Sequence, residues 1–329
     1  MRRIAALALG VLTAGCAPRP KITPVPADAP AELVALVGAA VMIGAGDIAS
    51  CGSTGDERTA HVVDSIIKAD SVAGVENFVF TLGDNAYPDG SARDFERCFT
   101  PSWGDPKKGI MKIIHPSPGN HEHYTTGASP YYEYFGPSAA GSAKRGYYSY
   151  DVGAWKVIVI NSEIVVNPVF PRSEEADQLA WIKNEMKTST KACTMAYFHH
   201  PRFSSGWHGS DARMAPTWQA MMDGGVDLVL AGHDHHYERL APMNAEGVRD
   251  TLKGIPSFVV GTGGGELRGL QSTLAPNSEY RLQGYFGVLK LTLGDKGYTA
   301  AFIDTNGRAW DPVAGSCIQN KAPTPTAAP

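Results

Sequence analysis

Runs of apolar residues alternate along the chain with helix-like stretches at 56–69, 174–187 and 211–223. The apolar runs are typical of buried strands, and several of them end in a cluster of Gly, Asp, Asn or His. The runs with this pattern begin at Val41, Asn77, Met111, Trp155, Ala192 and Val226. Strands that alternate with helices predict an α/β fold.

The last third of the chain has a different pattern, in which strand-like runs follow one another. These runs begin at Ser257, Gly284 and Tyr298 and predict an antiparallel part of the fold. The cluster GTGGGE at 261–266 lacks the lysine and the helix start that a nucleotide-cradling loop requires. We therefore interpret it as a turn that closes these later strands.

The first residues indicate an export signal. Arg2 and Arg3 precede an apolar stretch at 4–12, which is too short to span a bilayer as a permanent helix. The sequence LTAGC resembles a bacterial lipoprotein signal over 1–16, in which Cys16 becomes the lipidated residue. This resemblance implies an exported lipoprotein, anchored to a membrane in the periplasm or at the cell surface. Secretion without an anchor is the alternative.

Composition indicates a globular protein without a nucleic-acid partner. Of the 329 residues, 43% are hydrophobic and 19% are charged, which is enough for a full core. The formal charge of −4 comes without a long Lys/Arg run, which excludes the basic surface that a phosphate backbone requires. Pro and Ala are frequent in 17–37 and 319–329, so we expect a linker and a disordered tail around one domain at 38–318.

Four cysteines remain when Cys16 is set aside, and an even number in an exported protein indicates disulfide bonds. The sequence does not rank the three possible pairings. Our preference is Cys51 with Cys98 and Cys193 with Cys317. Four buried free thiols are the alternative.

Polar clusters follow the predicted strands at their carboxyl ends, where open α/β sheets bind ligands. Their carboxylate, amide, phenol and imidazole groups suit divalent or trivalent first-row metals, and there are enough of them for two ions. In chain order the clusters are Asp47, GDNAY at 83–87, GNHE at 119–122, His199 and GHDH at 232–235.

In this order the clusters resemble those of the metallophosphoesterase superfamily, also called calcineurin-like phosphoesterases, over residues 44–238. The tyrosine of GDNAY is similar to the purple acid phosphatases in particular. The resemblance implies a four-layer α/β/β/α sandwich of two mixed sheets flanked by helices. It also implies a phosphatase that hydrolyses small phosphomonoesters by in-line attack of a hydroxide held by two metal ions. A phosphodiesterase or nucleotidase, and an exported lipoprotein that binds metal or phosphate without turnover, are the alternatives.

The resemblance implies a ligand set for each metal ion. The first ion is bound by Asp47, Tyr87 and His235, the second by Asn120, His199 and His233, and Asp84 bridges both. Many members have a histidine ligand where this chain has Ala49, which cannot coordinate a metal. The phenolate of Tyr87 supplies the missing ligand and favours Fe³⁺, paired with Fe²⁺, Zn²⁺ or Mn²⁺. A tyrosine that only caps the strand end is the alternative.

Other residues near the clusters have expected roles of their own. The resemblance implies that His121 contacts the substrate phosphate, and a histidine bonded beneath the loop is the alternative. His208 stands where related phosphatases place a leaving-group acid, and a solvated loop histidine is the alternative. His200 is expected beside the metal ligands rather than among them. Hydrogen-bond partners of the ligand imidazoles are expected among Asp105, Glu122 and Glu238.

Overall fold

The computed structural model describes residues 39–139 and 145–318. The predicted export signal at 1–16 with Cys16, the linker at 17–37 and the tail at 319–329 lie outside the described residues. Within the described part of the chain, none of the helices has the length and apolar character that a membrane span requires.

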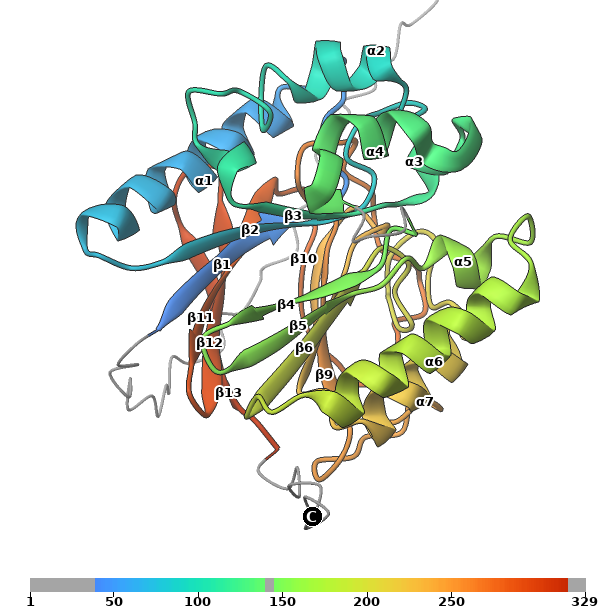
Figure 1. Ribbon diagram of the computed structural model, residues 1–329. Coiled ribbons are helices and arrows are strands. Elements are labelled where there is room, and N and C mark those ends of the chain that lie inside the picture. The colour runs from blue at the N-terminus through green and yellow to red at the C-terminus, as the bar shows by residue number, and fades with distance from the viewer. Residues whose placement is uncertain (1–38, 140–144, 319–329) are drawn as a thin grey trace, which may run out of the picture. The chain divides into compact units, whose positions relative to one another are not determined.

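One sheet is built from the two ends of the described chain (Figure 1). Its strands are β1 (Ala40–Ala45), β2 (Asn77–Leu82), β3 (Ile114–Ser117), β11 (Gly287–Gly294), β12 (Gly297–Asp304) and β13 (Ala309–Ser316). They lie in the order β13-β12-β11-β1-β2-β3. β1, β2 and β3 are parallel, whereas β11 pairs antiparallel with β1 and continues into β12 and β13 as a meander.

The other sheet is built from the middle of the chain. Its strands are β4 (Tyr148–Val152), β5 (Trp155–Val159), β6 (Cys193–Phe198), β7 (Leu228–Ala231), β8 (Tyr237–Met243), β9 (Ile255–Val260) and β10 (Ser278–Leu282). They lie in the order β10-β8-β9-β7-β6-β5-β4. β5, β6, β7 and β9 are parallel, and β4, β8 and β10 run antiparallel to their neighbours.

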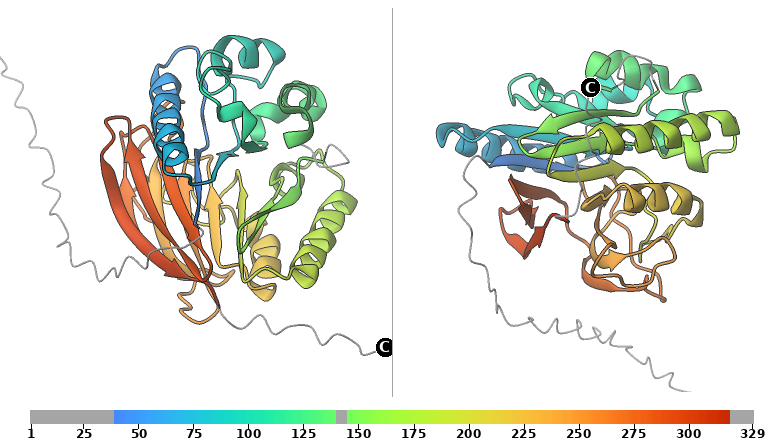
Figure 2. Two further views of the ribbon diagram at one scale, coloured as in Figure 1. Left: turned by 60° about the vertical axis from the view of Figure 1, so that its left-hand side comes forward. Right: turned by 60° about the horizontal axis from the view of Figure 1, so that its bottom comes forward.

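Helices cover the outer face of each sheet (Figure 1, Figure 2). They are α1 (Gly55–Val72), α2 (Ala92–Asp94), the π-helical η1 (Phe95–Phe99), the 3₁₀ turns η2 (Ile110–Lys112), η3 (Thr126–Ala128), η4 (Gly136–Ala139) and η6 (Ala212–Met214), α3 (Asn120–His123), α4 (Ser129–Phe135), α5 (Glu163–Val166), α6 (Arg172–Thr188) and α7 (Ala215–Asp223). α1 to α4 lie on the side of the first sheet, and α6 and α7 on that of the second. The predicted four-layer α/β/β/α sandwich of two mixed sheets is therefore confirmed.

The two sheets pack face to face through an apolar core. The ring centroids of Phe80 and Tyr197, from opposite sheets, lie 5.8 Å apart, and those of Tyr237 and Phe302 lie 4.8 Å apart. All four side chains are fully buried. Strands that are covered on both faces have continuous apolar runs, which explains why β1, β2, β6 and β7 are visible in the sequence.

The predicted elements with strong patterns are present. The helices predicted at 56–69, 174–187 and 211–223 are α1, α6 and α7. The strand predicted from Ser257 is β9, but it pairs in parallel with β7 in the second sheet instead of joining the late antiparallel meander. β4 and β8 were not predicted, because tyrosine, serine and charged side chains interrupt their apolar positions.

Both preferred disulfide pairings are confirmed, since Cys51 is bonded to Cys98 and Cys193 to Cys317. The second bond joins the start of β6 to the chain just after β13, so it links the two sheets. The first bond joins the loop after β1 to η1. The alternative of four free thiols is thereby excluded.

Candidate metal centre

Loops at the carboxyl ends of parallel strands carry the seven predicted ligands. Asp47 follows β1, Asp84 and Tyr87 follow β2, Asn120 begins α3 after β3, His199 follows β6, and His233 and His235 follow β7. The strands belong to both sheets, so the ligand loops meet at one edge of the sandwich. The structure brings all seven side chains together, and their role as metal ligands stays a prediction.

Three of these residues have a backbone conformation that non-glycine residues rarely adopt. The angle φ is 60° at Asp47, 49° at Asp84 and 69° at His233. A left-handed conformation costs an L-residue roughly 1–2 kcal/mol. Such strain is concentrated at functional sites, where surrounding contacts hold it in place.

Two glycines in the motifs make room for the ligands. A Cβ atom at Gly83 would lie 2.5 Å from Nδ1 of His199, and φ at Gly83 is 84°. A Cβ atom at Gly119 would lie 2.2 Å from Oδ1 of Asp84. Both distances are shorter than any real contact of a Cβ atom, which explains the glycine before Asp84 in GDNAY and before Asn120 in GNHE.

A first group of donor atoms surrounds the phenol oxygen of Tyr87. Tyr87 Oη lies 2.9 Å from Asp47 Oδ1 and 3.1 Å from His235 Nε2. It also lies 3.2 Å from Asp84 Oδ2. Asp47 Oδ1 and His235 Nε2 are themselves 3.2 Å apart. We call these four residues the first donor group.

A second group of donor atoms surrounds Nε2 of His199. This nitrogen lies 3.1 Å from Asn120 Oδ1 and 3.1 Å from His233 Nδ1. It lies 3.2 Å from Asp84 Oδ2. We call these four residues the second donor group. Asp84 Oδ2 belongs to both groups, as expected of a bridging carboxylate.

The two donor groups fit metal ions of the first transition row. Donor atoms that are each roughly 2.0–2.2 Å from one ion lie roughly 3 Å from one another. The observed separations in both groups are between 2.9 Å and 3.2 Å. The carboxylates and the phenol of the first group are hard donors that suit a trivalent ion, and the imidazoles of the second suit a divalent ion.

Asp84 and His199 dominate the electrostatics of this centre without metal. Burial would raise the pKa of Asp84, but the imidazoles of His199 and His121 outweigh burial and hold this pKa well below its usual value. Burial would lower the pKa of His199, but the Asp84 carboxylate raises it to about 10. Burial and the carboxylates of Asp47 and Asp84 raise the pKa of Tyr87 well above its usual value. Metal binding must therefore displace protons.

Main-chain carbonyls orient two of the ligand imidazoles. Nδ1 of His199 donates to the Leu82 carbonyl at 2.7 Å, and Nδ1 of His235 donates to the Glu266 carbonyl. A carbonyl only accepts, so Nδ1 carries the proton in both rings and Nε2 is left to face the donor groups.

The prediction that carboxylates orient the ligand imidazoles is wrong for Asp105, Glu122 and Glu238. Glu238 accepts from His236, which is not among the predicted ligands, at 3.0 Å. Asp105 accepts from Lys108 at 2.9 Å on the surface. Ligand imidazoles at the carboxyl ends of strands lie beside main-chain carbonyls, which take this role instead.

Glu122 is fully buried and holds the main chain of two ligand loops. Its carboxylate accepts the N–H of Asp84 at 3.0 Å and that of Asn85 at 2.8 Å. It also accepts the N–H of Gly119 at 2.7 Å. The loop after β2 is thereby fixed to the start of α3. A glutamate three residues after a helix N-cap is the spacing of a capping box, and this signal in GNHE predicts the contact to Gly119 but not those to the loop after β2.

Two further histidines lie at the edge of the donor groups, as the sequence predicts. Nδ1 of His121 donates to the Pro88 carbonyl, and its Nε2 lies 3.7 Å from Asp84 Oδ2. The ring of His208 lies against that of His233, with centroids 4.2 Å apart. The positions fit both expected roles, which stay predictions.

His200 lies beside the ligands. Its ring centroid is 4.4 Å from that of His233, and its Nδ1 shares a hydrogen bond of 2.9 Å with Ser162 Oγ. The side chain is buried behind the second donor group. Ligand atoms of His199, His200 and His233 lie within 4.8 Å of one another, so the expected place of His200 outside the ligand set stays a prediction.

Arg268 is a site residue that sequence reasoning missed. Its guanidinium donates to Nε2 of His208 at 2.7 Å. Burial lowers the pKa of His208, and the charge of Arg268 lowers it further, although Asp234 opposes both. The nearest signal in the sequence is the adjoining GTGGGE, whose pattern predicts a turn and not a part of the site.

The cluster GTGGGE packs against the first donor group. It begins the long loop at 261–277 between β9 and β10, which are separated by β8 in the sheet, so it is not the predicted turn between neighbouring strands. The N–H of Gly265 donates to the carbonyl of Asp47 at 2.8 Å, and that of Gly263 to the carbonyl of Gly46 at 2.9 Å. With the contact of the Glu266 carbonyl to His235, the loop supports ligands of the first group.

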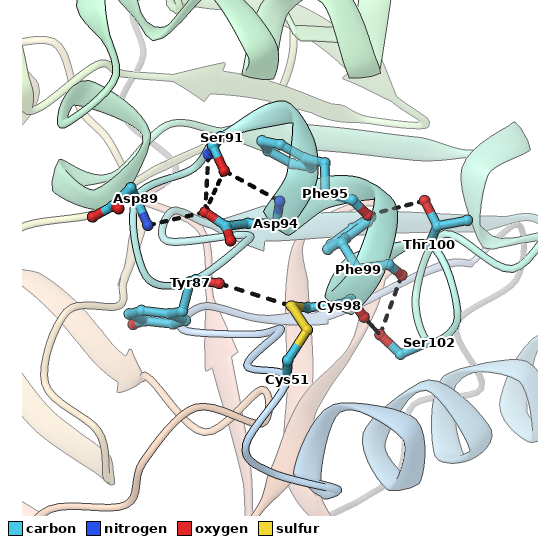
Figure 3. Close-up of a disulfide and its surroundings, with 10 residues drawn as sticks. All are labelled: Cys51, Tyr87, Asp89, Ser91, Asp94, Phe95, Cys98, Phe99, Thr100 and Ser102. Atoms are coloured by element: carbon cyan, nitrogen blue, oxygen red, sulfur yellow. Dashed lines mark hydrogen bonds between the residues drawn. A yellow bond between two sulfur atoms is a disulfide. The ribbon is translucent and has the colours of Figure 1, made fainter.

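The Cys51–Cys98 disulfide lies beside the main-chain carbonyl of Tyr87 (Figure 3). Cys98 Sγ is 3.9 Å from the Tyr87 carbonyl oxygen. The N–H of Tyr87 donates to the carbonyl of Ala49 at 2.8 Å. The disulfide and this hydrogen bond connect the loop that carries Tyr87 to the loop that carries Asp47, which fixes two members of the first donor group relative to each other.

Several known proteins are similar to this chain in sequence. A sequence model of the family described as calcineurin-like phosphoesterase matches residues 43–237. An uncharacterized protein of Mycobacterium tuberculosis is 28% identical over 160 residues, which cover 43% of this chain and 30% of that protein. Purple acid phosphatase 18 of Arabidopsis thaliana is 29% identical over 131 residues, which cover 38% of this chain and 28% of that protein. The matched part spans less than a third of either relative.

A solved structure with the same fold is that of a purple acid phosphatase from yellow lupin (Lupinus luteus) seeds. The TM-score is 0.67 at 18% sequence identity. The match covers 88% of this chain and 57% of the lupin chain. At this identity the similarity concerns the fold alone.

Proposed function

The chain belongs to the calcineurin-like phosphoesterase family, and on that premise we propose that it hydrolyses phosphomonoesters as a purple-acid-phosphatase-like enzyme. The observation that carries the proposal is the position of Tyr87 Oη, 2.9 Å from Asp47 Oδ1 and 3.1 Å from His235 Nε2. A phenolate in the first donor group, with Ala49 in place of an imidazole, supports Fe³⁺ there. The second donor group supports Fe²⁺, Zn²⁺ or Mn²⁺.

The two donor groups would hold the metal ions, which when bound would lower the pKa of water and polarise the phosphoryl group. The residues of the chain position the substrate. The Pro88 carbonyl fixes a proton on Nδ1 of His121, so Nε2 can donate to a phosphate oxygen only when the ring carries a second proton, as an imidazolium. Because Nε2 of His208 accepts from Arg268, the ring carries its proton on Nδ1 and can donate a hydrogen bond from there to a leaving-group oxygen.

Turnover of two model esters tests the proposal. Rates on p-nitrophenyl phosphate and bis(p-nitrophenyl) phosphate are measured over roughly pH 4 to 9, together with metal content by mass spectrometry. We expect faster hydrolysis of the monoester and an acidic optimum. Faster hydrolysis of the diester would support a phosphodiesterase. Binding of metal and phosphate without turnover of either ester would support the non-catalytic alternative.

Tyr87→Phe is expected to remove a visible absorption band that the aerobically purified wild type owes to charge transfer from the phenolate to iron. The substitution removes the phenol oxygen, whereas the ring keeps its edge contact with His121 at 4.4 Å between centroids. Activity is expected to fall about 10- to 100-fold. The absorption spectrum and the iron content of both proteins measure the effect.

Tyr134→Phe is the matched control for this experiment. The phenol of Tyr134 contacts Thr100 at 2.9 Å among the helices and lies in neither donor group, so the band should persist. A colourless wild type with full activity and only zinc or manganese would remove the assignment of Tyr87 as a ligand.

We also propose that the protein is exported and anchored as a lipoprotein through Cys16. The signal-like sequence at 1–16 and the two disulfides, which persist in oxidising compartments, support this proposal. Incorporation of a labelled fatty acid in a bacterial host tests it, with Cys16→Ser as the unlabelled control. A wild type that stays unlabelled and is released into the medium would instead be secreted without an anchor.

A further inference from the structure

Arg268 is connected to both donor groups. Its main-chain N–H donates to the carbonyl of His235, a member of the first donor group, at 3.2 Å. Its guanidinium donates to Nε2 of His208 at 2.7 Å. The ring of His208 lies against that of His233, a member of the second donor group, with centroids 4.2 Å apart. One imidazole ring therefore separates the guanidinium from a ligand residue.

The segment that carries Arg268 is fixed to the loop that carries His208. Leu270 forms an isolated β-bridge with Gly206. The buried carboxylate of Asp234, in the ligand loop after β7, accepts the main-chain N–H of His208 at 2.7 Å. These contacts fix the main chain on both sides, and the hydrogen bond to His208 holds the guanidinium there before a substrate binds, so less conformational entropy is lost on binding.

Within the part of the chain that the structure describes, most donors of this guanidinium lack a hydrogen-bond partner and are free for a ligand. Of its five N–H groups, one is used by His208. Among residues 39–139 and 145–318, the carboxylate nearest to Arg268 is that of Glu266, 4.0 Å from Nε. The Glu266 side chain is 81% exposed and that of Arg268 is 32% exposed, so water screens their attraction. Arg268 is thus a partly exposed, weakly neutralised cation beside the donor groups.

We propose that Arg268 is a specificity-determining residue that favours phosphomonoesters over phosphodiesters. This inference rests on the proposed function and adds the residue that sets the substrate class. Both ester classes offer two non-bridging oxygens to a metal centre, but a monoester has a third such oxygen and a second negative charge. A guanidinium binds charged phosphate oxygens through its planar fork of N–H groups. A diester has an ester group in place of this third oxygen.

Rates on the two model esters test this role. Arg268→Gln is expected to lower kcat/KM for p-nitrophenyl phosphate about 10- to 100-fold and to change that for bis(p-nitrophenyl) phosphate less than about threefold. Arg268→Lys keeps the positive charge but lacks the planar fork of N–H groups. Its ratio of kcat/KM for the monoester to kcat/KM for the diester should therefore lie between the ratios of the wild type and Arg268→Gln. Arg249→Gln is the matched control, because Arg249 follows β8, is 54% exposed and pairs with Glu279.

Binding of inorganic phosphate gives a readout without turnover. By titration calorimetry on preparations of equal metal content, the Kd should rise about tenfold in Arg268→Gln and stay unchanged in Arg249→Gln. Equal losses on both esters, or an unchanged phosphate affinity in Arg268→Gln, would overturn the inference. A metal-loaded wild type that hydrolyses neither ester would overturn the proposed function instead.

Discussion

Asp84→Asn is expected to lower kcat/KM for p-nitrophenyl phosphate about 1,000-fold or more and to prevent the protein from holding two metal ions. Asp84 Oδ2 lies 3.2 Å from Tyr87 Oη in the first donor group and 3.2 Å from His199 Nε2 in the second. An amide of the same shape offers one uncharged oxygen, and its NH₂ group repels a cation. The bridge between the two groups is therefore lost even though the volume is conserved.

Asp89→Asn on the same loop is the matched control for Asp84→Asn. Asp89 is exposed, and its main-chain N–H donates to Asp94. Its kinetics and metal content should equal those of the wild type. Metal analysis, steady-state rates and thermal melting are compared for the three proteins. An Asp84→Asn protein that retains both metals and more than about a tenth of the wild-type rate would show that another group forms the bridge.

The sequence predicts much of the arrangement of the two donor groups, because metal-binding side chains stand directly after the apolar runs that predict strands. A buried parallel strand is a continuous apolar run, and Asp47, Asp84 and Asn120 each follow one of these runs. The assignment of Tyr87 and His235 to one group came from the family resemblance and not from the pattern. Distances of 2.9–3.2 Å now place these side chains in the same two groups.

The contacts that support the donors were not predictable in the same way. Glu122 accepts main-chain N–H groups of the loop after β2, and the Leu82 carbonyl accepts from His199. Main-chain donors and acceptors are identical at every position, so the sequence does not show which of them lack a partner in the fold. Arg268 reaches the centre because two long loops pair with each other, which no local pattern encodes.

The helical layer between β2 and β4 was missed for a related reason. Its elements α2, η1, α3 and α4 are too short for a helical period to be visible. Aromatic packing holds them instead, since the ring of Phe95 lies 4.8 Å from that of Tyr134 and 5.6 Å from that of Phe135. These contacts join residues about 40 positions apart, a separation that periodicity does not detect.

Metal affinity is expected to fall as the pH falls, because the metal-free centre holds protons that metal binding must displace. The Asp84 carboxylate, 3.2 Å away, outweighs burial and raises the pKa of His199 to about 10, so this ring is protonated at neutral pH. The pKa of Tyr87 is raised well above its usual value by burial and by the neighbouring carboxylates, so its phenol is protonated as well. Each displaced proton changes the apparent association constant about tenfold per pH unit.

The protein is first made metal-free with a chelator. Titration calorimetry in two buffers that differ in ionisation enthalpy then measures the number of protons released when iron or zinc is added. About two protons should be released at neutral pH, one from His199 and one from Tyr87. Tyr87→Phe keeps the His199–Asp84 pair and should release about one proton fewer, which separates the two contributions. The metal-free protein could instead bind metal with the same affinity at roughly pH 6 and pH 8 and release no protons. This result would show that neither His199 nor Tyr87 is a ligand. The sign of the dependence follows from the raised pKa values, because lowering the pH can only strengthen the competition of protons for these two donors.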